Sequence, residues 1–366
     1  MFYEQELKAL KRVGRFRKRE IFDKKLIDLA SNDYLGLSKV KNNLKLAYEI
    51  VQNETFFSPK ASLLVNGYSK IHKSFEEILA EVNGFEDGVI LGSGYLANIA
   101  LVEALIRKRD ILFIDEEFHS SGVLATKLVN SKVIWFKHND PNDLREKLKK
   151  YSSSRNRVIL VEGIYSMSGN LLNREIFDLA DEFETILIVD EAHSSGVVGE
   201  RLLGVYELYD IPIKPNHIKM GTLGKAYGSY GAYILASNHI ITYLINRAKP
   251  IIYSTALSIF DTALAKVNFE YILQNYISLS SHIKRRKADI QKYFSKNIDS
   301  LILPIPFESD NRVKQLQKEL IKKGFLVGAI RRPTVQKPIL RVIPNLGVSD
   351  IEFEKFIDSC KELNII

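Results

Sequence analysis

Between about residues 85 and 235, the sequence alternates short apolar runs with longer amphipathic stretches. The runs are rich in valine, isoleucine and leucine, and they cover residues 89–91, 111–114, 133–136, 158–161, 186–189 and 217–220. Runs of this length and composition are typical of buried strands. Strands that alternate with helices run parallel and are covered by helices on both faces. The pattern therefore predicts an α/β fold in which a mostly parallel sheet lies between helices.

The periodicity changes after about residue 260. Long helical stretches follow, with two short strand candidates at 325–327 and 340–343. A chain of 366 residues is long enough for two or three domains. We therefore predict an N-terminal arm (1–38), a large α/β domain (39–262) and a smaller C-terminal α+β domain (263–366).

Composition excludes several classes of protein. The chain is 46% hydrophobic and 26% charged, as soluble globular proteins are. No apolar run approaches the roughly 18 residues of a membrane helix, and the acidic first residues lack the order of a signal peptide. Cys360 is the only cysteine, which excludes an internal disulfide and a cysteine-based metal site. We therefore expect a cytoplasmic protein with no metal site and no membrane partner.

The net charge of +8 is partly concentrated near the N-terminus. The basic residues there are Lys8, Lys11, Arg12, Arg15, Arg17, Lys18, Arg19, Lys24 and Lys25. Such a cluster is either a solvated helical face or a surface that attracts an anionic partner, such as a coenzyme A tail or an acidic carrier protein. Nucleic acid is the least favoured partner, because no nucleic-acid-binding motif accompanies the charge.

Chemically active side chains follow the carboxyl ends of several predicted strands. In chain order, these positions are Gly94, His119, Ser166, Asp190, His193 and Lys225. In parallel sheets, ligands bind beyond the carboxyl ends of the strands. We therefore expect these residues to converge on one crevice.

A carboxylate, an imidazole and an amine stand out among them. Asp190 ends an apolar run and is expected to be buried, where a carboxylate needs a cationic or hydrogen-bonding partner. Lys225 lies in a glycine-rich segment that can deliver its amine into a pocket, where it could bond to an aldehyde. Taken singly, Asp190 could be a strand-end cap, Lys225 a surface lysine and His193 a structural histidine. Together they favour pyridoxal phosphate (PLP), whose pyridinium nitrogen would pair with Asp190 while His193 bonds the phenolic oxygen.

The segment at 92–97 opens a helix directly after a strand. The N-terminus of such a helix favours an anion. Its pattern Gly-x-Gly-x-x-Ala, with Asp115 after the next strand, also matches the dinucleotide fingerprint, so an NAD-dependent oxidoreductase is the alternative class of enzyme. The match is short, and it leaves Lys225, Asp190 and His193 without a role. The segment around Lys225 is not a P-loop, because Ala226 follows the lysine.

These motifs, with others along nearly the whole chain, resemble the α-oxoamine synthases, a family of fold-type-I PLP enzymes. The matching segments are SNDYLGL at 31–37, SKIH at 69–72, SGYLAN at 93–98, EGIYSM at 162–167, VDEAH at 189–193, GTLGK at 221–225, IYST at 252–255 and LRV at 340–342. The resemblance implies a PLP-dependent acyltransferase with a large and a small domain.

The resemblance also implies roles around the cofactor ring. Lys225 would bond to the cofactor and then move the proton at the amino acid's Cα, and Asp190 would pair with the pyridine nitrogen. His119 would stack on the ring, and His193 and Ser166 would bond around its phenolic oxygen. Catalytic roles would thus fall to Lys225, His119 and Asp190.

Further residues would hold the phosphate and the substrates. The backbone of Gly94 and Tyr95, with Thr222, would bind the phosphate, and Thr255 would reach in from the other subunit of a homodimer. The substrate side would be formed by Asn32 and Arg341 at the amino acid's carboxylate and by Arg17 and Thr334 at the acyl group.

Two segments narrow the substrates. NGYS at 66–69 and RRPTV at 331–335 are most similar to the branch of the family that condenses L-alanine with a pimeloyl thioester in biotin synthesis. The acyl donor would be pimeloyl-CoA or a pimeloyl-carrier protein, and condensation of glycine with acetyl-CoA is the alternative. Two segments depart from the family: 58–65 lacks the usual glycines, which bears on acyl specificity, and MSGN at 167–170 replaces Met-Asp-Gly-Asp.

Overall fold

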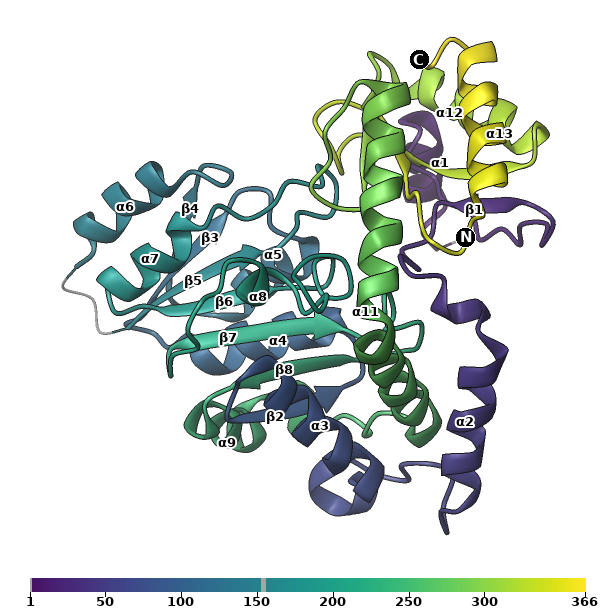
Figure 1. Cartoon of the computed structure of the whole chain (residues 1–366). Coiled ribbons are helices and arrows are strands. Elements are labelled where there is room, and N and C mark those ends of the chain that lie inside the picture. The colour runs from purple at the N-terminus through teal and green to yellow at the C-terminus, as the bar shows by residue number, and fades with distance from the viewer. Residues whose placement is uncertain (1, 153–155) are drawn as a thin grey trace.

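The computed structural model describes residues 2–152 and 156–366. Within them, a seven-stranded sheet forms the centre of the larger part of the molecule (Figure 1), with strand order β2-β8-β7-β6-β5-β3-β4. The strands are β2 (Asp87–Leu91), β3 (Ile111–Asp115), β4 (Lys132–Phe136), β5 (Arg157–Glu162), β6 (Ile186–Asp190), β7 (His217–Thr222) and β8 (Ala232–Ala236). The six predicted strands are all present, and the prediction of an α/β fold with a mostly parallel sheet is confirmed.

One strand of this sheet runs against the others. β8 is antiparallel to both β2 and β7, and the remaining pairs are parallel. The segment between β7 and β8 is only residues 223–231. That is too short for the helical crossover that parallel neighbours need, so the chain turns back on itself.

Helices cover both faces of the sheet. They are α3 (Lys70–Asn83), α4 (Gly94–Leu105), α5 (Ser120–Ala125), α6 (Pro141–Lys150), α7 (Glu175–Glu182), α8 (Val205–Leu208), α9 (Asn238–Arg247) and α10 (Lys249–Ile252), with short turns η2 (Leu63–Gly67) and η3 (Thr126–Leu128). Successive strand residues face opposite cores: Ile159 and Val161 belong to one apolar cluster, Val158 and Leu160 to the other. Both faces of the central strands are therefore buried, which explains their runs of apolar residues.

Helix α4 begins at Gly94, within the segment at 92–97 that is predicted to open a helix. The side-chain oxygen of Ser93 accepts a hydrogen bond from the backbone N–H of Leu96 at 3.3 Å. This N-cap fixes the helix start directly behind β2.

A second, four-stranded sheet lies in the smaller part of the described chain, in the order β1-β10-β11-β9. Its strands are β1 (Ile27–Leu29), β9 (Leu303–Pro306), β10 (Phe325–Ile330) and β11 (Ile339–Val342), and its helices are α12 (Asp310–Lys322) and α13 (Asp350–Glu362). The predicted strand at 325–327 falls within β10, and the one at 340–343 overlaps β11, which ends at Val342. β1 and β9 were missed because they are short, and β9 contains two prolines, Pro304 and Pro306.

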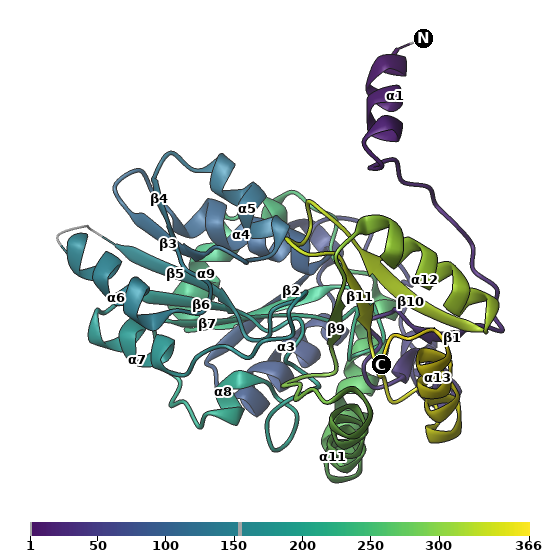
Figure 2. The same ribbon diagram turned by 90° about the horizontal axis from the view of Figure 1, so that it is seen from above.

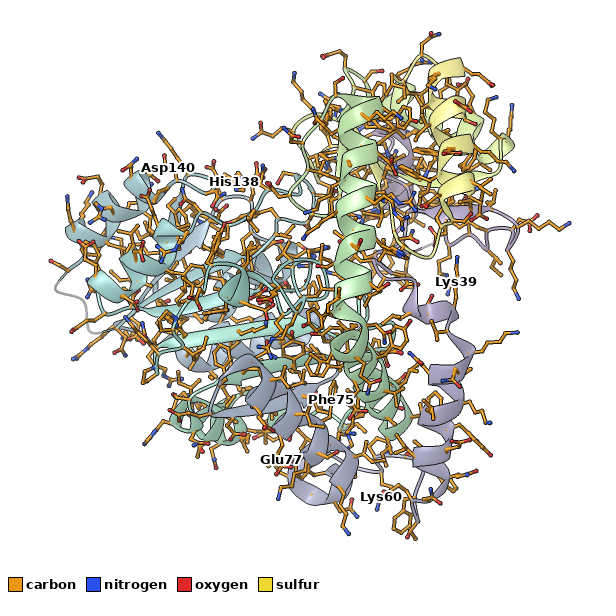
Figure 3. The ribbon with its side chains drawn as sticks, in the orientation of Figure 1. Lys39, Lys60, Phe75, Glu77, His138 and Asp140 are labelled. Atoms are coloured by element: carbon orange, nitrogen blue, oxygen red, sulfur yellow. The ribbon has the colours of Figure 1, made fainter. Side chains whose placement is uncertain are left out.

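The long helix α11 (Ile259–Phe294) connects the two parts (Figure 1). It begins before the predicted boundary at residue 262, and β1 of the predicted arm pairs with β10. The division into domains stays a prediction. Side chains fill the space between α11 and the large sheet (Figure 3), where Phe75 of α3 lies edge-on to Phe269 of α11 with ring centroids 6.2 Å apart.

The N-terminal segment crosses the molecule from one part to the other. Helix α1 (Glu4–Arg12) buries none of its residues and stands apart from the body in Figure 2. After β1 and the short turn η1 (Leu37–Lys39), helix α2 (Lys41–Gln52) runs along α11, where Asn43 Nδ2 donates to Asn268 Oδ1 at 2.8 Å.

Among the described residues, no helix is both long and apolar enough to span a bilayer.

At Gly36, the backbone of the N-terminal segment packs directly against the backbone of the C-terminal part. The φ of Gly36 is +71°, and an added Cβ would lie 2.5 Å from Cα of Gly347. Because backbone meets backbone there, Gly36→Ala should lower the free energy of unfolding by about 3 kcal/mol. Gly324→Ala is the matched control, since Gly324 also has positive φ (+93°) but no atom within 4 Å of an added Cβ, and it should cost only about 1 kcal/mol. Urea unfolding midpoints measure both, and equal shifts would contradict the proposed close approach.

Candidate active site

The parallel register aligns the ends of the central strands. Glu162, the last residue of β5, lies opposite Asp190, the last residue of β6, and Asp190 lies opposite Met220 of β7. His193 follows β6 and Lys225 follows β7. The Nζ of Lys225 lies 2.7 Å from Nε2 of His193, so the predicted amine and imidazole do meet at this edge.

The environment of Lys225 favours a reactive amine. Burial lowers the pKa of Lys225 to about 8, against the opposing effect of the Asp190 and Glu162 charges. Burial and the Lys225 charge hold the pKa of His193 well below its ordinary value, so this imidazole is neutral. A neutral His193 can accept a hydrogen bond from Lys225, and a substantial fraction of Lys225 is an uncharged nucleophile near neutral pH.

A chain of hydrogen bonds leads from His193 to Arg341. The hydroxyl of Tyr34 lies 2.6 Å from Nδ1 of His193 and donates to Asn32 Oδ1 at 3.4 Å. Asn32 Oδ1 also accepts from Arg341 Nη1 at 2.9 Å. Residues from the N-terminal segment, the large sheet and β11 thus form one connected network.

Arg341 retains unused donor capacity. Its Nε donates to the backbone carbonyl of Ser166 at 2.8 Å, but its Nη2 is buried and has no hydrogen-bond partner among the described residues. An unpaired buried guanidinium nitrogen is costly. A bound carboxylate could satisfy it in the paired geometry that arginine prefers.

Asp190 is buried without a salt-bridge partner among the described residues. Its side chain is 5% exposed, and it accepts hydrogen bonds from Asn98 Nδ2 at 2.8 Å and from the backbone N–H of Ala192 at 3.0 Å. Both donors are neutral. A cationic ligand group would therefore complete the environment of this carboxylate.

Asn98 also connects Asp190 to His119. Its Nδ2 donates to Ser121 Oγ at 2.9 Å, and Ser121 Oγ lies 2.8 Å from Nδ1 of His119. Burial lowers the pKa of His119, and its ring lies edge-on to Tyr95 at 6.3 Å between centroids. His119 is thereby held beside the helix start.

The start of α4 lies close to Thr222. A Cβ added to Gly94 would lie 3.7 Å from Thr222 Cβ, an ordinary van der Waals distance, so the helix start and Thr222 are neighbours. Thr222 Oγ1 donates to the Gly231 carbonyl at 3.0 Å and accepts from Gly224 N–H at 3.3 Å. The first N–H groups of a helix have no intrahelical partner, so Gly94, Tyr95 and Thr222 form a candidate anion cradle.

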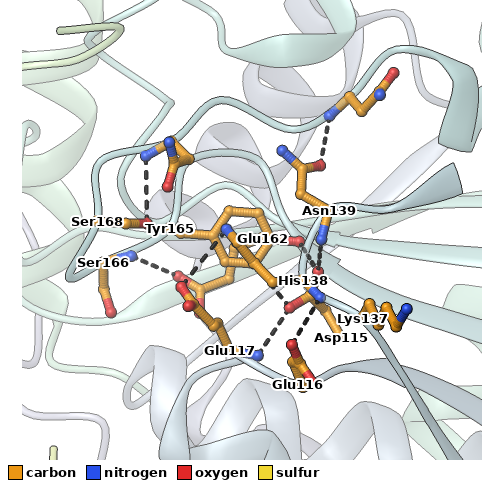
Figure 4. Close-up of polar contacts among 12 residues, drawn as sticks. Asp115, Glu116, Glu117, Lys137, His138, Asn139, Glu162, Tyr165, Ser166 and Ser168 are labelled. Carbon is orange, nitrogen blue, oxygen red and sulfur yellow. Dashed lines mark hydrogen bonds and ion pairs between the residues drawn. The ribbon is translucent and has the colours of Figure 1, made fainter. Parts of the chain in front are cut away.

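Glu162 is a further carboxyl of this edge. Its Oε2 accepts from the backbone N–H of Ser166 at 3.0 Å (Figure 4), and its buried Oε1 has no partner among the described residues. Burial raises the pKa of Glu162 well above its ordinary value, and the Asp190 charge adds to the effect. Both effects favour the protonated form of Glu162.

Three predicted site residues lie outside this network. Thr255 is exposed and forms an isolated bridge with Ser62. Arg17 is exposed in the segment after α1, and no described contact connects it to Lys225. Thr334 is exposed between β10 and β11, where it lines a separate cleft. Their roles stay predictions.

Four residues of the network have no role predicted from the sequence: Tyr34, Asn98, Ser121 and Glu162. Asn98 carried a usable signal, because it is a buried amide within an otherwise largely apolar helix. Tyr34 carried no such signal, since its contact with His193 joins residues 159 positions apart.

The acidic residue that a dinucleotide-binding site would need, Asp115, is already engaged in other hydrogen bonds. Asp115 accepts from Tyr165 OH at 2.7 Å and from the backbone N–H of Asn139 at 2.7 Å, and its Oδ1 lies 3.1 Å from His138 Nδ1 (Figure 4). Asp115 is fully buried. It is therefore not available to a ribose hydroxyl.

Comparisons with known proteins agree with this geometry. The sequence model of the aminotransferase class I and II family matches residues 24–359. The 8-amino-7-oxononanoate synthase of Helicobacter pylori strain J99 is 43% identical over 93% of this chain and 91% of its own length. The solved 8-amino-7-oxononanoate synthase of Francisella tularensis has a TM-score of 0.75 at 26% identity and covers 93% of this chain and 99% of that one. A solved chain designated SPT, with PLP, has a TM-score of 0.90 at 19% identity over 100% of this chain and 98% of that one, which supports the fold alone.

Proposed function

Since the chain belongs to the aminotransferase class I and II family, and within it to the α-oxoamine synthases, we propose that it is a PLP-dependent acyltransferase. In this proposal it condenses L-alanine with a pimeloyl thioester and releases 8-amino-7-oxononanoate, CO2 and free thiol, a step of biotin synthesis. The 43% identity to an 8-amino-7-oxononanoate synthase over 93% of the chain supports this choice of substrates.

The residues at the sheet edge suit PLP. Asp190 is a buried carboxylate with only neutral donors around it, as a protonated pyridine nitrogen requires. The cradle of Gly94, Tyr95 and Thr222 suits a phosphate. His119 would lie against the ring, and His193 and Ser166 near its phenolic oxygen.

PLP, when bound, withdraws electrons from the Cα of an amino acid and so makes its proton acidic. In the proposal, Lys225 would hold the cofactor through its aldehyde and would take the Cα proton of the bound amino acid as a general base. Its lowered pKa of about 8 suits both tasks. The hydrogen bond to neutral His193 orients the amine.

Arg341 and Asn32 are proposed to hold the carboxylate of the amino acid. The buried, unpartnered Nη2 of Arg341 supports this role. Asn32 keeps the guanidinium in place through its bond to Nη1. Arg17 and Thr334 stay proposed contacts of the acyl substrate.

A homodimer is part of the proposal. Thr255 lies in an exposed segment away from the Lys225 network of its own chain. This position is consistent with Thr255 serving the active site of a second copy. A cytoplasmic location is also proposed, because a single cysteine, Cys360, fits a reducing compartment.

The observation that carries the proposal is the contact of the half-buried Lys225 with His193, beside an Asp190 that has no salt-bridge partner among the described residues. The experiment measures free thiol released by the purified, PLP-loaded protein from a matrix of amino acids and acyl thioesters. L-Alanine with pimeloyl-CoA or pimeloyl-carrier protein should give the highest kcat/KM. Preference for glycine with acetyl-CoA would instead identify a glycine C-acetyltransferase, and NAD-linked turnover without thiol release would overturn the proposal.

A further inference from the structure

A cleft with a volume of about 610 Å³ lies between the large and small parts of the described chain. Its large-domain wall includes Phe118 and Tyr165, and its small-domain wall includes Lys296, Pro304 and Thr334. Phe118 directly precedes His119, and Tyr165 directly precedes Ser166. The cleft therefore begins beside the candidate active site.

The acidic groups of the cleft are engaged by one histidine. Glu117 Oε2 lies 3.5 Å from His138 Nε2, and Glu116 Oε1 accepts from the backbone N–H of His138 at 3.2 Å (Figure 4). Asp115 Oδ1 lies 3.1 Å from Nδ1 of the same imidazole. Burial opposes protonation, but the Asp115 and Glu117 carboxylates outweigh it and raise the pKa of His138. Asp115 and Glu117 are thus paired with this imidazole, whereas Glu116 contacts only the neutral backbone N–H.

The lysines of the cleft are not neutralised in this way. Lys296 is half-buried, and its Nζ donates to the backbone carbonyl of Pro304 at 2.8 Å. Lys337 is exposed at the rim. Within residues 2–152 and 156–366, neither lysine forms an ion pair. Burial lowers the pKa of Lys296, so an anion beside it would be favourable.

The walls around Lys296 are largely apolar. Phe118, Pro304 and Ile339 face the cleft together with the aliphatic part of the lysine itself. A single half-buried ammonium at the end of an apolar wall suits a methylene chain that ends in one carboxylate.

We propose that Lys296 binds an anionic group of the acyl donor, namely the carboxylate at the far end of a dicarboxylic acyl chain. Lys337 supports it from the rim. The inference rests on the proposed function, because it takes the acyl thioester as the substrate. It adds the residue that distinguishes a dicarboxylic acyl chain from a simple fatty acyl chain. The phosphates of a CoA donor are the other possible source of the anion.

Calorimetric titration of the PLP-loaded protein separates the two sources without relying on turnover. The ligands are pimeloyl-CoA, heptanoyl-CoA, which lacks the distal carboxylate, and the N-acetylcysteamine thioester of pimelate, which lacks the phosphates. Lys296→Ala should weaken both pimeloyl ligands by about 10- to 100-fold, the range of a lost charge-assisted hydrogen bond, and leave heptanoyl-CoA unchanged. Lys296→Arg should restore most of the affinity.

Lys292→Ala is the matched control, because Lys292 is an exposed lysine in the last turn of α11, four residues before Lys296, and does not line the cleft. It should bind all three ligands as the wild type does. Where the wild type turns over, the loss in Lys296→Ala should appear in KM rather than kcat.

Two outcomes would overturn the carboxylate assignment. Equal weakening of both CoA thioesters, with the N-acetylcysteamine thioester unaffected, would assign the anion to the CoA phosphates. Unchanged affinities throughout would remove Lys296 from the acyl site. Neither outcome bears on the proposed reaction. That proposal would be contradicted only if the wild type formed no condensation product.

Discussion

Lys225→Ala is expected to abolish condensation, with kcat/KM falling by about 1,000-fold or more. The reason is that this amine has two tasks, the covalent bond to the cofactor and the removal of the Cα proton. Within the described network it is the amine that meets His193 at the strand ends. Thiol release measures the loss, and borohydride reduction followed by peptide mapping should find the cofactor on Lys225 in the wild type and nowhere in the variant.

The pH dependence of that bond gives a second measure of the same lysine. The neutral amine attacks the aldehyde, so the rate of covalent cofactor incorporation should rise as the pH increases through about 8 and then level off. An ordinary lysine would level off only above about 10. Lys318→Ala, at an exposed lysine on α12, is the control and should behave as the wild type. Retained turnover in Lys225→Ala would mean that another amine carries the reaction.

Asp190→Asn is expected to lower kcat by about 100- to 1,000-fold, because a neutral amide cannot hold a protonated pyridine nitrogen by charge. The substitution keeps the shape of the side chain. Asn98 can rotate its amide to offer the Oδ1 that has no partner in the described structure, so the hydrogen-bond geometry survives. The measurement is single-turnover kinetics with PLP at saturation.

The fold itself should be unaffected by Asp190→Asn. Thermal unfolding of the apoprotein should match that of the wild type and of Asp178→Asn, a control at an exposed position of α7. A kcat within about threefold of the wild type, in a correctly folded variant, would mean that Asp190 does not act on the cofactor.

The large sheet was predictable because its central parallel strands, such as β5 and β6, are buried on both faces. Burial on both faces produces continuous apolar runs such as 158–161, which stand out in the sequence. The reversed strand β8 was not foreseen, since its direction depends on the length of the preceding loop rather than on its own residues. β1 was not predicted, because a strand of three residues is too short to show a periodic pattern.

The candidate site was predictable for a related reason. Parallel strands end at one edge, so residues that follow them, such as Asp190 and Lys225, must lie near each other. The sequence could not reveal the hydrogen bonds that connect the N-terminal segment to this edge. Tyr34 and Asn32 reach His193 and Arg341 only after the chain has folded across both parts.

Release of CO2 from L-alanine labelled at its carboxyl carbon tests the central claim most directly. With pimeloyl-CoA as the acyl donor, the wild-type protein should release the label as CO2, one molecule for each free thiol, and the amino ketone product should carry none. This result would establish that the Lys225 site joins carbon to carbon with loss of the carboxyl group. A product that retains the label, or thiol release without labelled CO2, would contradict the account.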